Sequence, residues 1–113
     1  MNDWVKEASI AVTVCDRNGM IKEMNDKSGK TFENRGGLDL IGSNLLECHP
    51  EPSKTKLKKM LADPAPRPNA YTIEKNGVKK LIYQFASRKN GGSDGLVELS
   101  LELPPDMPHF VRK

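Results

Sequence analysis

The chain has 113 residues, of which 36% are hydrophobic and 29% charged, and its formal net charge is +3. This length suits one domain with one core, and the composition excludes a disordered or fibrous protein. No stretch approaches the roughly 20 apolar residues of a membrane-spanning helix. Residues 1–7 lack the basic start and apolar run of a secretory signal. We therefore expect a cytoplasmic protein, and the modest charge predicts neither a membrane nor a nucleic acid as its partner.

The first elements are two short strands joined by a turn. Residues 10–14 alternate large apolar with small or polar side chains, which is the period of a half-buried strand. The positions expected to face the core are Ile10, Val12 and Val14. Turn chemistry at Asn18-Gly19 then leads into a second strand over residues 20–24, so the two strands should form a hairpin.

Short helices should follow, because glycines interrupt residues 25–46 too often for a long helix. The expected inward anchors are Phe32, Leu38, Ile41, Leu45 and Leu46. Ser53 is placed to cap a longer helix over residues 54–62, whose lysines form the solvated face. The apolar face of this helix carries Leu57, Met60 and Leu61.

Three strands complete the expected sheet, over residues 70–74, 80–88 and 96–103, after a proline-rich connector. Asn76-Gly77 separates the first two, and a loop over residues 90–95 separates the last two. The side chains expected to face inward are Leu81, Tyr83 and Phe85 on one strand and Val97, Leu99, Leu101 and Leu103 on the next. Those expected on the outer face of the first of these strands are Ile82, Gln84 and Ala86, whereas Glu98, Ser100 and Glu102 should be solvated.

The order of elements predicts an α+β fold, with a five-stranded antiparallel sheet covered on one face by short helices and one longer helix. Residues 1–113 should form a single domain with its core over about residues 8–103. Residues 1–7 are an N-terminal segment, and residues 104–113 are an extended tail.

This order resembles the PAS domain family. The matching motifs are Asp16-Arg17-Asn18-Gly19-Met20-Ile21 before Asn25, then Leu40-Ile41-Gly42, and Gly95 before the last strand. A narrower likeness concerns Leu46-Glu47-Cys48-His49-Pro50 and the closing residues 103–109. These look like small prokaryotic PAS proteins and PAS modules fused to hemerythrin-like domains.

The resemblance implies a sensor that binds a small ligand or cofactor in an internal pocket and relays occupancy to a signalling partner protein. A homodimer is expected through the N-terminal segment, which contains Trp4 and Val5, and through the outer sheet face. The alternative is a ligand-free interaction or dimerisation module. An enzyme is not expected, because no nucleophile and base can be paired and His109 lies in the tail.

The candidate ligand contacts are mainly core positions of the expected fold. They are Val12, Val14, Phe32, Leu45, His49, Met60, Tyr83, Phe85 and Leu99. His49 could ligate a haem iron, as a histidine of this region does in PAS haem sensors, or it could be a surface or capping residue with no metal. The two cysteines, Cys15 and Cys48, are expected to be free thiols.

Overall fold

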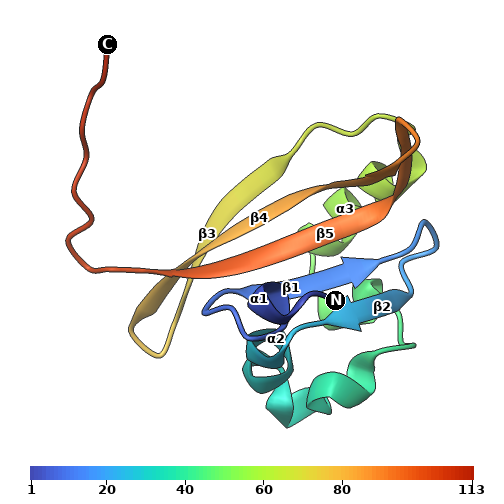
Figure 1. Cartoon of the computed structure of the whole chain (residues 1–113), viewed down its shortest axis with the longest axis horizontal. Coiled ribbons are helices and arrows are strands. Elements are labelled where there is room, and N and C mark those ends of the chain that lie inside the picture. Colours follow the sequence, from blue (N-terminus) through green and yellow to red (C-terminus); the bar gives the residue numbers. More distant parts are fainter.

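The computed structural model of the chain describes all residues, Met1–Lys113. Five antiparallel strands form one sheet in the order β2-β1-β5-β4-β3. The strands are β1 (Ala11–Cys15), β2 (Ile21–Met24), β3 (Asn69–Lys75), β4 (Val78–Lys89) and β5 (Gly92–Leu103). The predicted α+β class and five-stranded antiparallel sheet are confirmed (Figure 1).

The helices are short, as the glycine-rich sequence predicts. They are α1 (Asp3–Lys6), α2 (Asp26–Thr31), α3 (Ser53–Ala62) and the 3-10 helices η1 (Glu33–Arg35), η2 (Gly37–Leu40) and η3 (Leu45–Cys48). None of them combines the length and hydrophobicity needed to span a lipid bilayer. After β5 the chain runs away from the body of the domain as an extended tail (Figure 1).

The β1–β2 hairpin is closed by the predicted turn. The Asp16 carboxylate accepts hydrogen bonds from the amides of Asn18 and Met20, at 2.9 and 3.0 Å. Gly19 has a φ of +84°, a conformation that L side chains rarely adopt. The hairpin prediction is confirmed by the antiparallel pairing of β1 with β2.

Asn-Gly turns join the last three strands. Asn76 and Gly77 have φ values of 53° and 78°, and Asn90 and Gly91 have values of 53° and 82°. Positive φ at both central residues is the type I′ geometry that matches the twist of a hairpin. The predicted loop over residues 90–95 is therefore wrong, because a two-residue turn suffices and β5 already begins at Gly92.

The start of α3 corrects the predicted cap. Ser53 is the first helical residue, and its side chain caps nothing. Instead the Glu51 carboxylate accepts from the amide and the hydroxyl of Thr55, at 2.8 and 2.9 Å. A carboxylate is favoured at this position because the first-turn amides lack partners and carry a partial positive charge.

The strand faces are the reverse of those predicted. The inner face, which the helices cover, carries Ala11, Thr13, Cys15, Ile82, Gln84, Leu96, Glu98 and Ser100. The outer face carries Val12, Val14, Leu81, Tyr83, Phe85, Val97, Leu99, Leu101 and Leu103. Alternation shows which residues share a face but not which face the helices cover, and a shift of one residue exchanges the two.

The hydrophobic core occupies one end of the space between sheet and helices. It consists of Cys15, Ile21, Met24, Leu45, Leu57, Met60 and Leu96, with Phe32, Leu40, Leu46 and Leu61 packed against it. Two predicted anchors are wrong, since Leu38 and Ile41 are 47% and 45% exposed. They lie in and beside η2 at the surface of the domain, where Leu38 packs against Gly29 of α2.

Asn25 ties the start of the chain to the sheet and to α2. Its side-chain oxygen accepts from the amides of Val12 and Ser28, at 2.9 and 3.0 Å. Its side-chain nitrogen donates to the carbonyls of Val5 and Ile10, at 2.9 and 2.8 Å. The Asn25 side chain is fully buried, so its four hydrogen bonds form inside the domain. Removing the side chain would leave these backbone groups without a partner.

Replacing Asn25 by alanine should lower the free energy of unfolding by about 2–4 kcal/mol, because buried amides and carbonyls lose their partner and α2 loses its cap. Urea denaturation measures the change. Asn2→Ala is the matched control, since the exposed Asn2 precedes α1 without a side-chain hydrogen bond. Equal loss in both variants would contradict this role of Asn25.

Candidate functional site

A cavity of about 320 Å³ lies between the inner sheet face and the helical segments. Its hydroxyl groups come from Thr13, Thr31, Ser53, Tyr71 and Ser100, and its ionisable groups from Arg35, Cys48, His49, Lys75, Lys80 and Glu98. Its apolar walls are Ala11, Phe32, Pro50, Ile73 and Ile82, and Asn34 completes the lining. The volume is at the lower end of the range for small-molecule sites. The polar lining is unusual for the interior of so small a domain.

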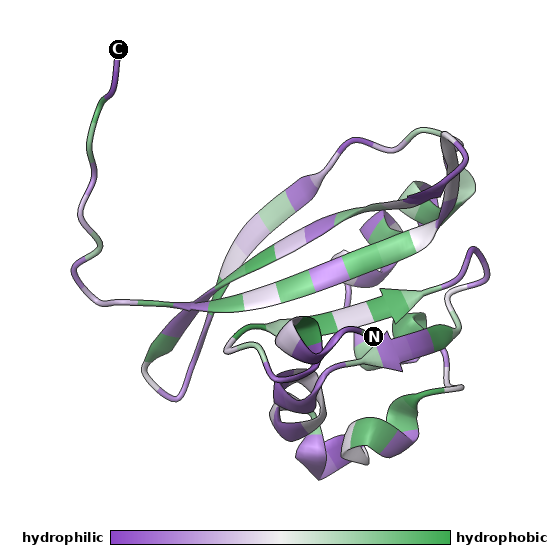
Figure 2. Cartoon of the chain, viewed as in Figure 1, coloured by the Kyte–Doolittle hydropathy of each residue, from purple (hydrophilic) through white to green (hydrophobic).

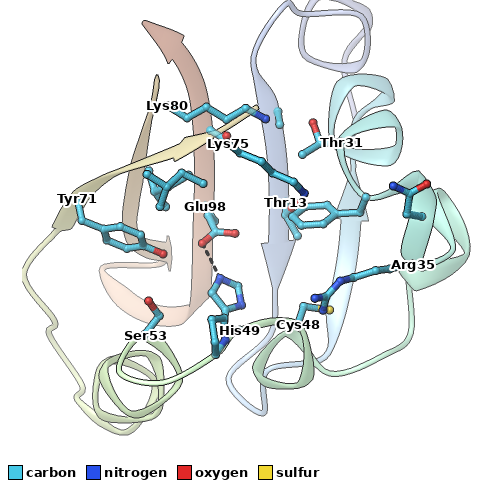
Figure 3. Close-up of a pocket in the computed structure, with 17 residues that line it drawn as sticks. Thr13, Thr31, Arg35, Cys48, His49, Ser53, Tyr71, Lys75, Lys80 and Glu98 are labelled. Atoms are coloured by element: carbon cyan, nitrogen blue, oxygen red, sulfur yellow. Dashed lines mark hydrogen bonds and ion pairs between the residues drawn. The ribbon is translucent and has the colours of Figure 1, made fainter. Parts of the chain in front are cut away.

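His49 follows η3 and points at the sheet (Figure 3). Its Nδ1 lies 3.0 Å from the Leu45 carbonyl oxygen, and its Nε2 lies 2.9 Å from Glu98 Oε1. A carbonyl and an ionised carboxylate both accept hydrogen bonds. We therefore assign His49 as an imidazolium that donates from both ring nitrogens and pairs with Glu98 in the cavity floor.

The pKa of His49 reflects this pairing. Burial disfavours the charged ring, but the hydrogen bond and the charge of Glu98, with the Leu45 carbonyl, raise the pKa above its ordinary value of 6.5. The positive charge of Arg35 opposes the rise in part.

A row of polar side chains carries the network across the sheet. Gln84 Nε2 donates to Glu98 Oε1 at 2.7 Å, and Asn69 Nδ2 donates to the side-chain oxygen Oε1 of Gln84 at 2.9 Å. The row connects β5, β4 and β3, where these residues are direct cross-strand neighbours. Glu98 and Gln84 are 7% and 1% exposed. Buried polar groups of this kind fix a unique arrangement when their hydrogen bonds are satisfied.

The arrangement of His49 does not fit axial ligation of a haem iron. Ligation needs a ring nitrogen with a free lone pair, and here both nitrogens are turned to acceptors. No three His, Cys, Asp or Glu side chains gather elsewhere as a metal site. We therefore derive no role for iron from this site.

Three cationic side chains approach the cavity from opposite sides. Lys75 and Lys80 reach in from the β3–β4 hairpin, and Arg35 reaches in from η1 beside Cys48 (Figure 3). None of the three forms a salt bridge, whereas the Lys27, Lys6 and Lys22 side chains do. Arg35 and Lys75 are exposed and Lys80 is half-buried, so the three place positive charge at the open side of the cavity. Cations without acidic partners beside a cavity favour an anionic ligand.

Two further groups complete the lining. The Tyr71 hydroxyl points toward Ser53 (Figure 3), and burial is the main reason that its pKa is raised. Burial likewise raises the pKa of the Cys48 thiol, so the positive charge of Arg35 nearby does not make it a thiolate. Both cysteines are free thiols, and Cys15 is buried in the hydrophobic core.

The predicted ligand contacts divide into three groups. Phe32 and His49 line the cavity. Leu45 and Met60 lie in the hydrophobic core and do not line it. The residues placed on the outer sheet face, away from the cavity, are Val12, Val14, Tyr83, Phe85 and Leu99.

Sequence reasoning missed most of the polar lining. Glu98 and Ser100 were expected on a solvated face, and Gln84 on the outer face, because polar positions of an alternating strand usually face water. In the structure, Thr13, Glu98 and Gln84 are cross-strand neighbours on one face of the sheet. The sequence shows that these positions are polar, but it does not show that the helices cover their face.

The charge state of His49 generates a test by NMR titration. The ring should show protons on both nitrogens at neutral pH and a pKa above 6.5. In Glu98→Gln the pKa should fall below that of the native protein, because burial then acts with less opposition. A native pKa at or below 6.5, or no change in Glu98→Gln, would contradict the assignment.

The same pairing sets the sign of the pH dependence of stability. A raised pKa in the folded state means that the paired imidazolium stabilises the fold fully below about pH 6.5. This contribution is lost as the pH rises through the folded-state pKa. Urea denaturation from about pH 6 upward should show the free energy of unfolding of the native protein falling as the pH rises through the folded-state pKa of His49. The fall should be smaller in His49→Gln.

Comparison with known proteins identifies the fold. No family model and no curated protein matches the sequence. Among solved structures, the chain is similar to the Aer2 receptor of Vibrio cholerae, described as a dual PAS-heme oxygen sensor, with 15% identity, a TM-score of 0.65, and coverage of 85% of this chain and 96% of that one. The PAS domain of BvgS from Bordetella pertussis has 16% identity, a TM-score of 0.63, and coverage of 88% and 81%. A sensory box sensor histidine kinase from Vibrio cholerae has 18% identity, a TM-score of 0.58, and coverage of 92% and 89%. These similarities confirm the predicted resemblance at the level of structure: the chain has the PAS fold.

Proposed function

We propose that the chain is a sensor and signalling module that binds a small ligand in the cavity between sheet and helices. The observation that carries the proposal is the cavity itself, which opens to solvent on one side and is lined by polar groups that converge from five separate segments of the chain. A concave site that combines apolar walls with a few convergent polar groups is the usual form of a small-molecule site. Two structural relatives are described as a PAS-heme oxygen sensor and a sensor histidine kinase, which supports a sensory role.

β5 gives the site a route to the outside of the domain. Glu98 faces the cavity, whereas its neighbours Val97 and Leu99 face outward on the same strand. A ligand that alters the His49–Glu98 pair would therefore shift the strand that forms the outer surface. Ligand binding would thereby change the populations of two conformations of β5, and a partner protein that binds one of them more tightly would respond to the ligand.

Binding, and not catalysis, is the role that suits these residues. The His49 imidazolium has no lone pair with which to accept a proton, and the Cys48 pKa is raised and not lowered. We also propose the cytoplasm as the location, in keeping with a free Cys48 beside the cavity.

A cavity-filling substitution tests the sensor proposal. Purified native protein, equilibrated with a small-molecule metabolite library, should retain bound mass in native mass spectrometry. Ser100→Phe should abolish it, because Ser100 lines the cavity. Leu99→Phe is the matched control, since this adjacent residue faces outward and should leave binding unchanged.

The outcome against the proposal is equally clear. Absence of bound mass in the native protein, or equal binding by Ser100→Phe and Leu99→Phe, would contradict a ligand in the cavity. Circular dichroism should show that both variants keep the native fold.

A dimerisation role is favoured by a separate observation, the apolar outer sheet face. Val14, Leu81, Phe85, Val97 and Leu99 are only partly buried there, and Tyr83 is 37% exposed. Hydrophobic positions recur along β4 and β5 in Figure 2. An apolar face of this extent marks an interaction surface, and self-pairing about a two-fold axis is the common solution. We propose that a second copy of the chain covers it.

The two ends of the chain extend this surface. Trp4 in α1 is 74% exposed, and the tail exposes Met107, Phe110 and Val111. No part of the domain covers these side chains, so a second copy could bury them together with the sheet face. The proposed dimer interface therefore includes the N-terminal segment, as expected from the sequence. On the sheet, however, it is formed by Leu81, Tyr83 and Phe85 in place of the expected Ile82, Gln84 and Ala86.

Charge on the outer face should disrupt the dimer. Sedimentation velocity of the native protein should give the mass of a dimer, and Tyr83→Lys should give a monomer with an intact circular dichroism spectrum. Lys58→Glu on the exposed side of α3 is the control and should remain dimeric. A monomeric native protein at high concentration would contradict the proposal.

A further inference from the structure

We propose that the ligand is a small organic carboxylate, with its carboxylate held by Arg35, Lys75 and Lys80 and its body against Phe32 and Ile82. This inference rests on the proposed sensor function and names the chemical class of the ligand. Three features support it: the unpaired cations around the cavity, the apolar side chains in its lining, and the amides at the start of α3, which already have acceptors within the chain.

The charges around the cavity do not balance. The His49 imidazolium and the Glu98 carboxylate neutralise each other in the floor. Glu98 is the only acidic residue in the lining, so Arg35, Lys75 and Lys80 remain without an acidic partner. An anion of low charge would satisfy these three cations.

A second pocket, which shares Lys75 and Lys80 with the cavity, contains two acidic residues. Glu102 is the cross-strand neighbour of Lys80 but forms its ion pair with Lys27, at 3.4 Å. Glu33, the other acidic residue, shares this second pocket with Lys30. The positive surplus on the cavity side is therefore left for an external ligand.

The three cations reach the cavity from two sides. Lys75 and Lys80 flank the β3–β4 turn on one side, and Arg35 closes η1 on the other (Figure 3). Phe32 lines the same cavity. A guanidinium binds carboxylates through paired hydrogen bonds, and lysines add flexible point charges.

The rest of the lining suits an organic body and not a bare inorganic ion. Phe32, Ile73 and Ile82 offer apolar walls, and Thr13, Tyr71 and Ser100 offer hydroxyls that fix orientation. Oε1 of Glu98 already accepts from His49 and Gln84, whereas no protein group donates to Oε2. That oxygen is the acceptor for a hydroxyl or amino group on the ligand.

The site offers fewer hydrogen-bond donors of the kind that phosphate sites use. Phosphate sites commonly use the free amides of a helix start. At the start of α3, which borders the cavity, the Lys54 amide donates to the Pro50 carbonyl and the Thr55 amide to the Glu51 carboxylate. These amides are already occupied within the chain.

Matched ligands test the inference by isothermal titration calorimetry and one-dimensional ligand-observed NMR. The carboxylates run from propionate through succinate and lactate to phenylacetate. Phenylacetamide is the neutral counterpart of phenylacetate, and phenyl phosphate and inorganic phosphate represent the other anion. We expect at least one carboxylate to bind and its amide to bind about tenfold or more weakly, because the amide forfeits charge-assisted hydrogen bonds.

Variants of the cations locate the binding. Arg35→Gln and Lys80→Gln should each weaken the carboxylate by about tenfold and reduce the salt dependence of binding. Lys79→Gln is the matched control, because Lys79 neighbours Lys80 on β4, is exposed and does not line the cavity. Its affinity should equal that of the native protein.

Each other outcome overturns the inference. Equal affinity for phenylacetate and phenylacetamide would exclude an anion, tighter binding of phenyl phosphate alone would replace carboxylate by phosphate, and no binding within the series would exclude the class. In all three cases a bound mass that Ser100→Phe abolishes would leave the sensor function standing. Loss of that bound mass in the native protein would remove both.

Discussion

The ion pair between His49 and Glu98 is the interaction on which the cavity depends. It brings the segment after η3 against the central strand β5, where His49 and Gln84 both bind Oε1 of the buried Glu98. A buried charge is costly unless it is paired and hydrogen-bonded, so neither residue could occupy this floor without the other. The space above the pair remains open because polar groups, and not interlocking aliphatic side chains, line the adjoining part of the sheet.

The domain divides its hydrophobic and polar groups in an uncommon way. Aliphatic packing is confined to the end of the sheet near α3 and η3, and the polar row of Thr13, Glu98 and Gln84 occupies the inner face beside it. The outer face is left apolar and partly exposed. One strand thus carries a polar network on its cavity side and hydrophobic side chains on its outer side, and β5 would therefore link the proposed ligand site to the proposed dimer surface.

Sequence reasoning succeeded where the chemistry is local. The Asn18-Gly19 turn, the Asn76-Gly77 turn and the succession of five strands along the chain could be predicted, because turn residues and alternation are visible in short stretches of sequence. The position of β1 beside β5 in the sheet was not predicted. The choice of sheet face could not, since alternation is symmetric with respect to inside and outside. The cation cluster was also out of reach, because Arg35 and Lys80 are brought together only by the tertiary fold. Asn25 was recognised only as a motif, and its four buried hydrogen bonds became apparent in three dimensions.

A crystal structure of the native protein, purified without exogenous ligand and then soaked with the tightest-binding carboxylate, is the most direct test that the polar side of the sheet is a ligand site. We expect difference density for the carboxylate between Lys80 and Arg35, next to Phe32, with the His49–Glu98 hydrogen bond intact. Density on the outer face, or a cavity closed by its own side chains in every crystal, would contradict it.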